Sequence, residues 1–356
     1  MSLAALREQY PILERVAYLN AGSTGPVARA AQESAARELA AEVEEGRGYP
    51  HFERRFELLA ALRDGYAELL GCDAADLALS TSTSEGIGKV LAGLEIGPGD
   101  EIVTSDSEHP GLVGPLIAAR ERGAAIRAVP FADLADAVGP QTTLVACSHV
   151  NWHSGEIAPA ALADAGVPVI LDGAQSVGAI PVDVVKLGCA AFAGSGQKWL
   201  CGADGTGMLY LTPEFAERVR ATAPSYISFE DASRGFESAL KQDARRYDTP
   251  SLAREVVALS LAALDVLRAA DLAAVLAHGP ALAAELADRL ANRGLTVAPR
   301  DHTTLVAWED DDPEATRERL AAAGIVIRNL PGTPLVRASV GAWSSEDDLE
   351  RLLAAL

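Results

Sequence analysis

The chain has 356 residues, of which 49% are hydrophobic and 22% are charged, and its formal net charge at neutral pH is −20. The length predicts about two domains with room for a sizeable core, and the apolar fraction excludes a disordered chain. The excess of acidic residues argues against a nucleic-acid partner, because such proteins need clustered positive charge.

The amino-terminal residues MSLAALREQYPILERV lack an apolar stretch followed by a small-residue cleavage site, so they do not resemble a signal peptide. No apolar run approaches the roughly 20 residues that cross a bilayer. The cysteines are widely spaced and form no CxxC pair, which is typical of reduced thiols. We therefore expect a cytoplasmic protein without a membrane partner. The four cysteines are Cys72, Cys147, Cys189 and Cys201.

The first two thirds of the chain alternate helical segments with short apolar segments. An amphipathic helix is expected over Phe52–Leu70 and is ended by Gly71. Further helices are expected at Pro110–Arg122 and Pro159–Asp164. Continuous apolar runs such as VPVIL and TLVACS predict strands buried on both faces, as in a mostly parallel, doubly wound α/β domain. The expected strands are Leu77–Ser80, Glu101–Ser105, Ala125–Val129, Thr143–Ser148, Val167–Leu171, Ala190–Gly194 and Thr206–Leu211.

The last third has a different pattern. Long helices rich in Ala and Leu are expected between Leu252 and Asn292, interrupted at His278-Gly279-Pro280. The order that follows predicts a smaller α+β domain. The expected division is residues 1–15 as a segment packing on the small domain, 16–250 as the large domain and 251–356 as the small one. The expected small-domain elements are strands at Leu295–Pro299 and Thr303–Trp308, a helix at Pro313–Ala323, strands at Ile325–Asn329 and Leu335–Val340, and a helix at Ser344–Leu356.

Chemically competent residues follow several of the predicted strands. Asp172 ends one strand, Lys198 follows the next, His109 follows a third, and the hydroxyl-rich stretch 81–86 opens a helix after a fourth. Ligands of open α/β sheets bind beyond the carboxyl ends of the strands, so these groups should converge. Pyridoxal 5′-phosphate (PLP) requires this set: a lysine for a Schiff base, a carboxylate for the ring nitrogen and a helix start for the phosphate.

Three segments resemble the class V aminotransferase family of fold-type I PLP-dependent enzymes: SEHPG (107–111), LDGAQSVGAIPVDV (171–184) and GSGQKWLCGADGTGMLYL (194–211). The likeness extends from YLNAGSTGPV (18–27) to RASVGAWSSEDDLERLL (337–353) and is nearest to cysteine/cystine C–S lyases and cysteine desulfurase-like members. The resemblance implies PLP as cofactor, an amino acid as substrate, and a homodimer with active sites at the interface.

The resemblance also implies a role for each matching residue. Lys198 would form the Schiff base and shuttle protons, Asp172 would pair with the pyridine nitrogen, and His109 would stack on the ring. Thr249 is the candidate for a phosphate contact supplied by the other subunit. The remaining expectations are Gln175 at the ring hydroxyl, Thr83, Ser84, Ser195 and Gln197 at the phosphate, Arg337 at the substrate α-carboxylate, and Trp152 and Asn20 at the substrate.

Several positions depart from the family pattern. Gln197 stands where most relatives have His, and Gly341 and Trp343 replace the usual His and Tyr after Arg337. Trp152 occupies a position that is Asn in the desulfurases and Trp in the C–S lyases. No cysteine follows Cys201, so the mobile-loop cysteine of persulfide-relay desulfurases is missing. Trp152, the SEHPG segment and the missing loop cysteine favour a C–S lyase that eliminates a β-sulfur group.

Other interpretations remain open at this point. An aminotransferase or an epimerase would use the same residues, and a binding module could keep the fold without activity. Two further motifs are weak evidence for other functions. Ser195-x-x-Lys198 matches the serine-lysine motif of penicillin-binding enzymes, but their companion motifs are missing. His149 and His153 follow a strand without a completing ligand set, so we predict no metal site.

Overall fold

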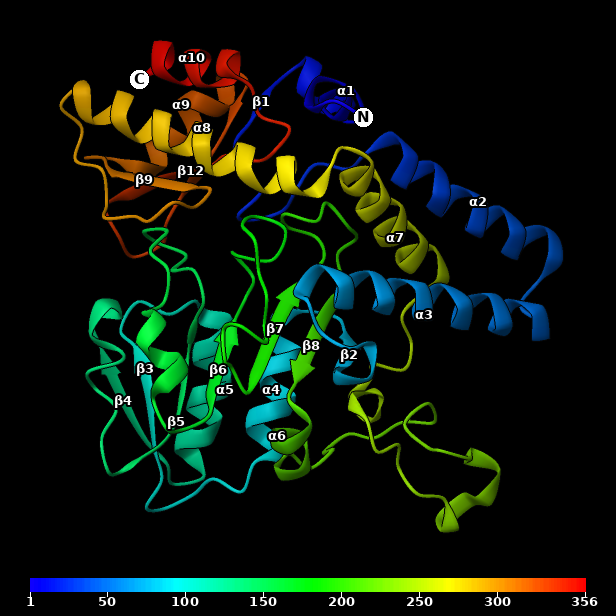
Figure 1. The fold of residues 1–356 in the computed structure, drawn as a ribbon. Helices are drawn as coiled ribbons and strands as arrows, with labels where there is room; N and C mark the ends of the chain where they lie inside the picture. Colours follow the sequence, from blue (N-terminus) through cyan, green and yellow to red (C-terminus); the bar gives the residue numbers. More distant parts are fainter.

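The structure, a computed structural model, describes residues 1–356. Its centre is a seven-stranded sheet of order β2-β8-β7-β6-β5-β3-β4 (Figure 1). Only β8 runs antiparallel to its neighbours, so the prediction of a mostly parallel, doubly wound sheet is confirmed. The strands are β2 (Leu77–Ser80), β3 (Glu101–Ser105), β4 (Ala125–Val129), β5 (Thr142–Ser148), β6 (Val169–Asp172), β7 (Ala191–Ser195) and β8 (Gly207–Leu211).

Helices cover both faces of this sheet, which explains the continuous apolar strands. Successive side chains of a strand point to opposite faces. In β5, Val145 and Cys147 therefore join one core while Leu144 and Ala146 join the other. The edge strand β4 is the exception, because most of its side chains are exposed or half-buried. The first face is covered by α3 (Tyr49–Leu70) and α7 (Arg254–Ala269), the second by α4 (Thr83–Gly93) and α5 (Pro110–Glu121).

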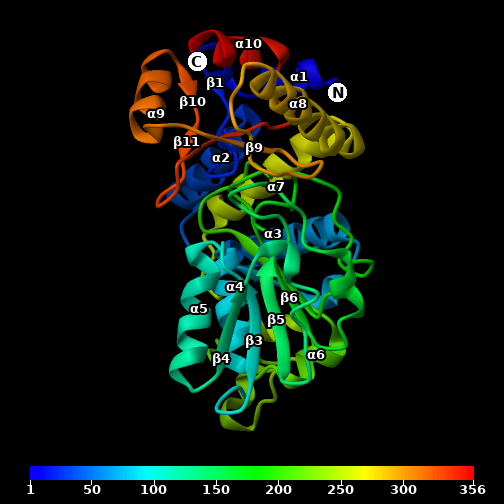
Figure 2. The same cartoon turned by 90° about the vertical axis from the view of Figure 1, so that its left-hand side faces the viewer.

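A smaller group of elements lies beyond the end of the sheet (Figure 2). It contains a three-stranded antiparallel sheet of order β11-β12-β9 and a short parallel pair, β1 with β10. Ala17 and Leu19 belong to its core although they come early in the chain. The division at residues 15 and 250 stays a prediction. The elements are β1 (Ala17–Tyr18), α8 (Leu272–Asn292), β9 (Leu305–Glu309), α9 (Pro313–Ala322), β10 (Ile325–Val326), β11 (Arg328–Asn329), β12 (Leu335–Ser339) and α10 (Glu346–Ala355).

Two local expectations about the last third are wrong. The segment Leu295–Pro299 forms no strand and makes a single bridge, from Val297 to Trp308. The interruption between the long helices falls at Asp271, whose φ is 63°, and α8 runs through Pro280. Gly279 serves a close approach instead: a Cβ there would lie 2.8 Å from the Val340 carbonyl oxygen.

The remaining elements connect these layers. The expected helix at Pro159–Asp164 is a short 3-10 helix, whereas the α3 prediction is confirmed with Gly71 as its left-handed cap (φ 69°). None of the helices combines the length and the apolarity needed to span a bilayer. In Figure 1, α2 and α3 form an arm that extends to one side. The further helices are α1 (Leu3–Glu8), α2 (Arg29–Glu45) and α6 (Pro213–Arg218), with 3-10 helices at Pro11–Glu14, Ala74–Asp76, Phe131–Asp133, Ala160–Asp164, Ala232–Glu237 and Ala244–Tyr247.

Candidate active site

The carboxyl ends of three adjacent strands bring the predicted residues to one edge of the sheet. Asp172 is the last residue of β6, and Ser195 is the last residue of β7. Asp172 is the ladder partner of Ser148 on one side and of Ala193 on the other. The topology thus places Asp172 centrally at this edge, as the predicted strand ends required.

Lys198 follows β7 in a tight turn beneath the amino-terminal segment. The Gly25 amide donates to the Gln197 carbonyl at 2.8 Å, and a Cβ on Gly25 would lie 2.1 Å from the Lys198 carbonyl oxygen. Only glycine permits this approach. Burial lowers the pKa of the Lys198 amine to about 8, against the opposing pull of Asp172. A lysine with that pKa is a competent nucleophile and proton acceptor near neutral pH.

Asp172 is buried and has one backbone partner. Its Oδ1 accepts from the Ala174 amide at 2.9 Å. Burial raises the pKa of the Asp172 carboxyl, while Lys198 pulls it down. The charge of each group shifts the pKa of the other, yet Asp172 and Lys198 make no direct ion pair within 4.0 Å. A buried acid and a half-buried amine that lack mutual contact leave both free for a third group.

The start of α4 supplies hydrogen-bond donors beside this pair. Ser82 caps the helix by accepting from the Glu85 amide at 3.1 Å. The Ser84 hydroxyl approaches the His109 loop, because a Cβ on Gly111 would lie 2.4 Å from its Oγ. First-turn amides of a helix have no intrahelical acceptor and favour anions. Three buried side-chain oxygens likewise have no partner: Thr83 Oγ1, Ser195 Oγ and Gln197 Oε1.

His109 occupies the position before α5. Its Nδ1 accepts from the Gly111 amide at 3.0 Å, so the ring proton resides on Nε2. Burial, with the positive charge of Lys198 and the arginines, lowers the pKa of His109 to about 4. The imidazole is therefore neutral at pH 7. Trp152 meets it edge to face, with ring centroids 5.0 Å apart.

Arg337 is a fully buried cation without a counter-ion. Its Nη1 donates to the Trp152 carbonyl at 2.5 Å, whereas Nε and Nη2 have no partner. Burial and the nearby Arg328 lower the pKa of Arg337 to about 9, which leaves it charged at pH 7. An unpaired buried guanidinium is costly, so an anion is expected there. Asn20 lies nearby, bridging to Ser339 and accepting from the Ser23 hydroxyl at 2.9 Å.

Arg328 is a second cation that the sequence interpretation missed. It lies directly opposite Arg337 in the β11–β12 pair. Its Nη1 donates to Ser23 Oγ at 3.1 Å, and its charge contributes to the lowered pKa values of both Lys198 and His109. Pairing the two predicted strands around the turn at residues 330–334 could have revealed it.

Two predicted contacts have protein partners in the structure. The Gln175 side chain donates to the Gly22 carbonyl at 2.8 Å and accepts from Trp199 Nε1 at 3.1 Å. Thr249 donates to Glu85 Oε1 at 2.6 Å and accepts from Lys89 at 2.9 Å within its own chain. Thr249 thus lies beside α4, whose first turn holds Thr83 and Ser84.

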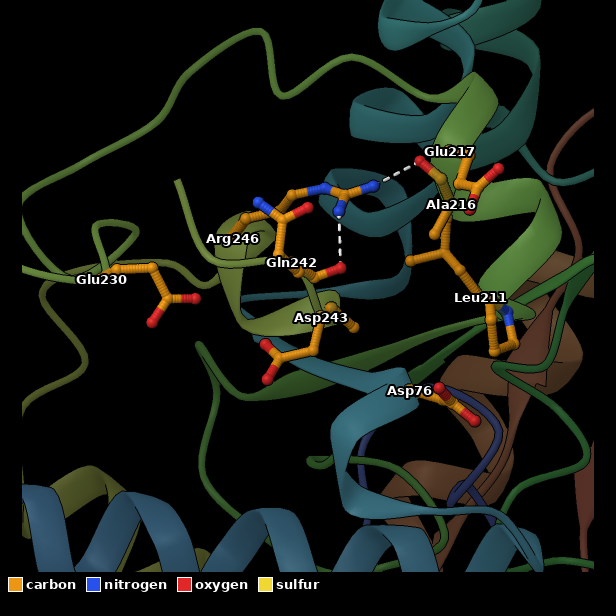
Figure 3. Close-up of a pocket in the computed structure, with 10 residues that line it drawn as sticks. Asp76, Leu211, Ala216, Glu217, Glu230, Gln242, Asp243 and Arg246 are labelled. Carbon is orange, nitrogen blue, oxygen red and sulfur yellow. Dashed lines mark hydrogen bonds between the residues drawn. The ribbon is translucent and has the colours of Figure 1, made fainter. Parts of the chain in front are cut away.

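A cleft of about 690 Å3 lies elsewhere (Figure 3). Asp76, which directly precedes β2, and Leu211, which ends β8, line it, at the opposite ends of these strands from Ser80 and Gly207. It therefore opens at the far edge of the sheet from Lys198. Its Arg246 guanidinium donates to the carbonyls of Gln242 and Ala216. Figure 3 shows carboxylates around it, and none of its lining side chains carries a buried polar atom without a partner.

Comparison with known proteins agrees with this geometry. Residues 17–352 match the family described as Aminotransferase class-V. An isopenicillin N epimerase from Streptomyces clavuligerus is 30% identical, and the alignment covers 96% of this chain and 94% of that protein. A probable cysteine desulfurase from Pseudomonas aeruginosa is also 30% identical, over 79% of this chain and 77% of its own length.

Solved structures of similar proteins include one with the cofactor. A C-DES mutant with glycine covalently linked to its PLP superposes with a TM-score of 0.92 at 26% identity, covering 98% of both chains. The cystine C–S lyase C-DES with its product cysteine persulfide gives a TM-score of 0.91 at 26% identity, covering 97% of this chain and 98% of that one. The fold is thus that of fold-type I PLP enzymes. The chain belongs to the class-V aminotransferase family of PLP-dependent enzymes.

Proposed function

We propose that this chain binds PLP covalently through Lys198 and acts on an amino acid, most readily as a C–S lyase on cysteine, cystine or a related thio-amino acid. One observation carries the proposal. Asp172 ends β6 and the half-buried Lys198 follows β7 at one edge of the large sheet, and Arg337 of β12 lies close enough for its charge to lower the pKa of Lys198. None of the three is neutralised by an ion pair.

The residues present fit a phosphorylated aromatic cofactor. Unpartnered buried hydroxyls at Thr83 and Ser195, with Gln197 and the first turn of α4, would hold a phosphate. Asp172 would hold a protonated ring nitrogen, and Gln175 has hydrogen-bonding capacity left for a ring hydroxyl. His109, kept neutral, would lie on the ring face. Gln197 stands where most relatives have His, so the residues that would hold the phosphate carry less positive charge here.

Each side chain of the candidate site has a separate role in the proposed reaction. PLP supplies an electron sink for the bonds at the substrate α-carbon. Lys198 Nζ binds the cofactor, and its pKa of about 8 lets it accept and return the α-proton. Asp172 keeps a proton on the ring nitrogen. Arg337, with Asn20 and Trp152 beside it, orients the substrate α-carboxylate, and the neutral His109 excludes water from the ring face.

Three observations support elimination as the reaction. Trp152 is buried (6% exposed) against His109, as expected for the C–S lyase-type position, and similarity to the cystine C–S lyase C-DES extends over nearly the whole chain. No cysteine follows Cys201 to carry a persulfide. The 30% identity to a protein described as isopenicillin N epimerase keeps epimerisation as the second candidate, with transamination on the same residues.

A homodimer is part of the proposal. Exposed apolar side chains gather on the arm formed by α2 and α3, including Val43 (86% exposed) and Tyr49 (76%). Such clusters on a folded chain mark interaction surfaces. With Thr249 already bonded to Glu85, a phosphate contact across the interface would need that threonine to serve both groups.

The reaction type is tested with a panel of substrates. Purified protein with PLP is incubated with cysteine, cystine and several amino acids, with and without a 2-oxo acid. We expect pyruvate and sulfide-containing product from cystine or cysteine without the 2-oxo acid, because elimination needs no acceptor. Turnover only with the 2-oxo acid would instead establish transamination, and racemised substrate without pyruvate would establish epimerisation.

A further inference from the structure

The segment between β3 and α5 carries His109 and makes one backbone hydrogen bond to the sheet, from the Asp106 amide to the Val129 carbonyl at 2.9 Å. Side-chain contacts hold it to the segment that follows β5. Asn151 Nδ2 donates to Ser107 Oγ at 2.8 Å, and Trp152 Nε1 donates to the Ser107 carbonyl at 2.9 Å. The rings of His109 and Trp152 are in contact, and these hydrogen bonds join the two segments that carry them.

Glu108 is the buried charge within this junction. Its Oε1 and Oε2 accept from the Ser148 amide at 3.0 and 3.1 Å, and Oε2 also accepts from Ser148 Oγ at 2.5 Å. The side chain is 8% exposed and makes no ion pair with a cation. A carboxylate that accepts several hydrogen bonds is held far more firmly than a neutral group in the same position.

Ser148 links this carboxylate to the catalytic edge of the sheet. It is the ladder partner of Asp172, and the His149 amide donates to the Asp172 carbonyl at 2.8 Å. The Glu108 carboxyl, bonded to the end of β5, thus has the buried Asp172 carboxyl at the end of the neighbouring strand β6. The two like charges disfavour simultaneous ionisation.

We propose that Glu108 is a positioning residue that clamps the His109 segment to the end of β5, and that its charge sets how firmly the clamp holds. This inference rests on the proposed PLP function for its purpose, because the clamped His109 would lie on the cofactor ring. The clamp itself is a property of the folded chain.

The charge of Glu108 can change near neutral pH. Burial raises the pKa of its carboxyl to about 7, the hydrogen bonds from Ser148 lower it, and Asp172 raises it further. The titratable groups around it are Asp172 on β6 and Cys147 on β5, with Asp106 and Arg120 lining an adjoining cavity of about 210 Å3. Glu108 itself lines that cavity. Above pH 7 the ionised carboxylate accepts hydrogen bonds from both the amide and the hydroxyl of Ser148. Below pH 7 the added proton occupies one carboxyl oxygen and weakens these hydrogen bonds.

Two matched variants separate shape from charge. Glu108→Gln keeps the size but removes the charge and turns an NH2 group toward the Ser148 donors. Ser148→Ala keeps the charge but removes one donor, so it should raise the pKa of Glu108. The reporter is the Trp152 indole N–H signal in NMR spectra of the full chain, assigned by Trp152→Phe and followed from pH 5 to 9, with and without PLP.

We expect the wild-type Trp152 signal to titrate with a midpoint near pH 7. The midpoint should be missing in Glu108→Gln and should move to higher pH in Ser148→Ala. The His153 ring lies tilted against the same indole, with ring centroids 4.1 Å apart, and burial lowers its pKa below the ordinary histidine value. Its titration therefore falls below the Glu108 midpoint and is common to all three proteins. The same midpoint in Glu108→Gln as in wild type would overturn the proposal, and this result does not depend on cofactor binding.

The purpose of the clamp is tested in the loaded protein. Glu108→Gln should weaken PLP affinity about 10-fold, the size expected for disturbing a charge-assisted hydrogen bond. Protonation of the Lys198 amine should weaken binding below pH 7 in both proteins, so wild-type affinity should fall more steeply there than that of Glu108→Gln. Parallel pH dependence in the two proteins would show that the clamp has no bearing on the cofactor.

Discussion

Lys198→Ala should lower turnover by about 10⁴-fold, because it would remove both the proposed covalent attachment and the proposed proton acceptor at the α-carbon. The variant is expected to fold, since the Lys198 amine makes no hydrogen bond or ion pair that would be broken. Removing a half-buried amine should if anything relieve its partial desolvation. Steady-state kinetics with the best substrate of the panel measures the effect, and circular dichroism monitors the fold.

Lys186→Ala is the matched control. That lysine is exposed and pairs with Asp183 at 2.7 Å on the surface, so its loss should leave kcat unchanged. Added primary amines should restore part of the activity of Lys198→Ala if the lost function is a proton transfer. Lys198→Ala activity within a few-fold of wild type would exclude a covalent role for this residue.

Arg337→Gln should lower kcat/KM by about 100-fold or more, chiefly through KM. A buried charge that pairs with a substrate anion contributes several kcal/mol, and truncating it removes that interaction. Arg337→Lys keeps a charge but loses the planar fork that matches a carboxylate, so it should fall between wild type and Arg337→Gln. Initial-rate kinetics on all three proteins gives the ordering.

A substrate analogue without the α-carboxylate provides the control for Arg337. The amine counterpart of the best substrate should be a poor substrate for wild type and equally poor for Arg337→Gln. It has no α-carboxylate, so removing the Arg337 guanidinium removes no interaction with it. If Arg337→Gln discriminates between acid and amine as strongly as wild type does, the α-carboxylate binds elsewhere, with Arg328 as the nearest alternative cation.

The large sheet could be predicted from sequence because its strands are buried on both faces. Runs such as VPVIL and TLVACS have no polar alternation, and their ends are set by Asp172 and Ser148, polar residues at the site edge. The edge strand β4 was found as well, although its exposed side chains make it the weakest of the set.

The small domain was harder because tertiary contacts decide its elements. Leu295–Pro299 has an apolar strand pattern, yet only Val297 reaches a partner, across from Trp308. His278-Gly279-Pro280 looks like a helix end, but α8 continues through it because the small Gly279 packs against the Val340 carbonyl. The break comes at Asp271, where an unusual positive φ gives no local signal in the sequence.

In the candidate site, too, residues that depend on tertiary contacts could not be predicted from the sequence. Motif residues that end strands or open helices, such as Lys198, Asp172 and Thr83, lie where the strand ends place them. Arg328 and Glu108 escaped notice because their importance comes from partners distant in sequence. Arg328 matters through its register with Arg337, and Glu108 matters through Ser148, which lies in the next strand of the sheet.

The most direct test of the whole account locates the cofactor attachment. Protein incubated with PLP at pH 8.5, where the Lys198 amine (pKa about 8) is mostly neutral, is reduced with borohydride, digested and analysed by mass spectrometry. We predict a yellow protein and a phosphopyridoxyl group on the peptide that contains Lys198. A colourless protein, or the group on another lysine with Lys198 unmodified, would contradict the account.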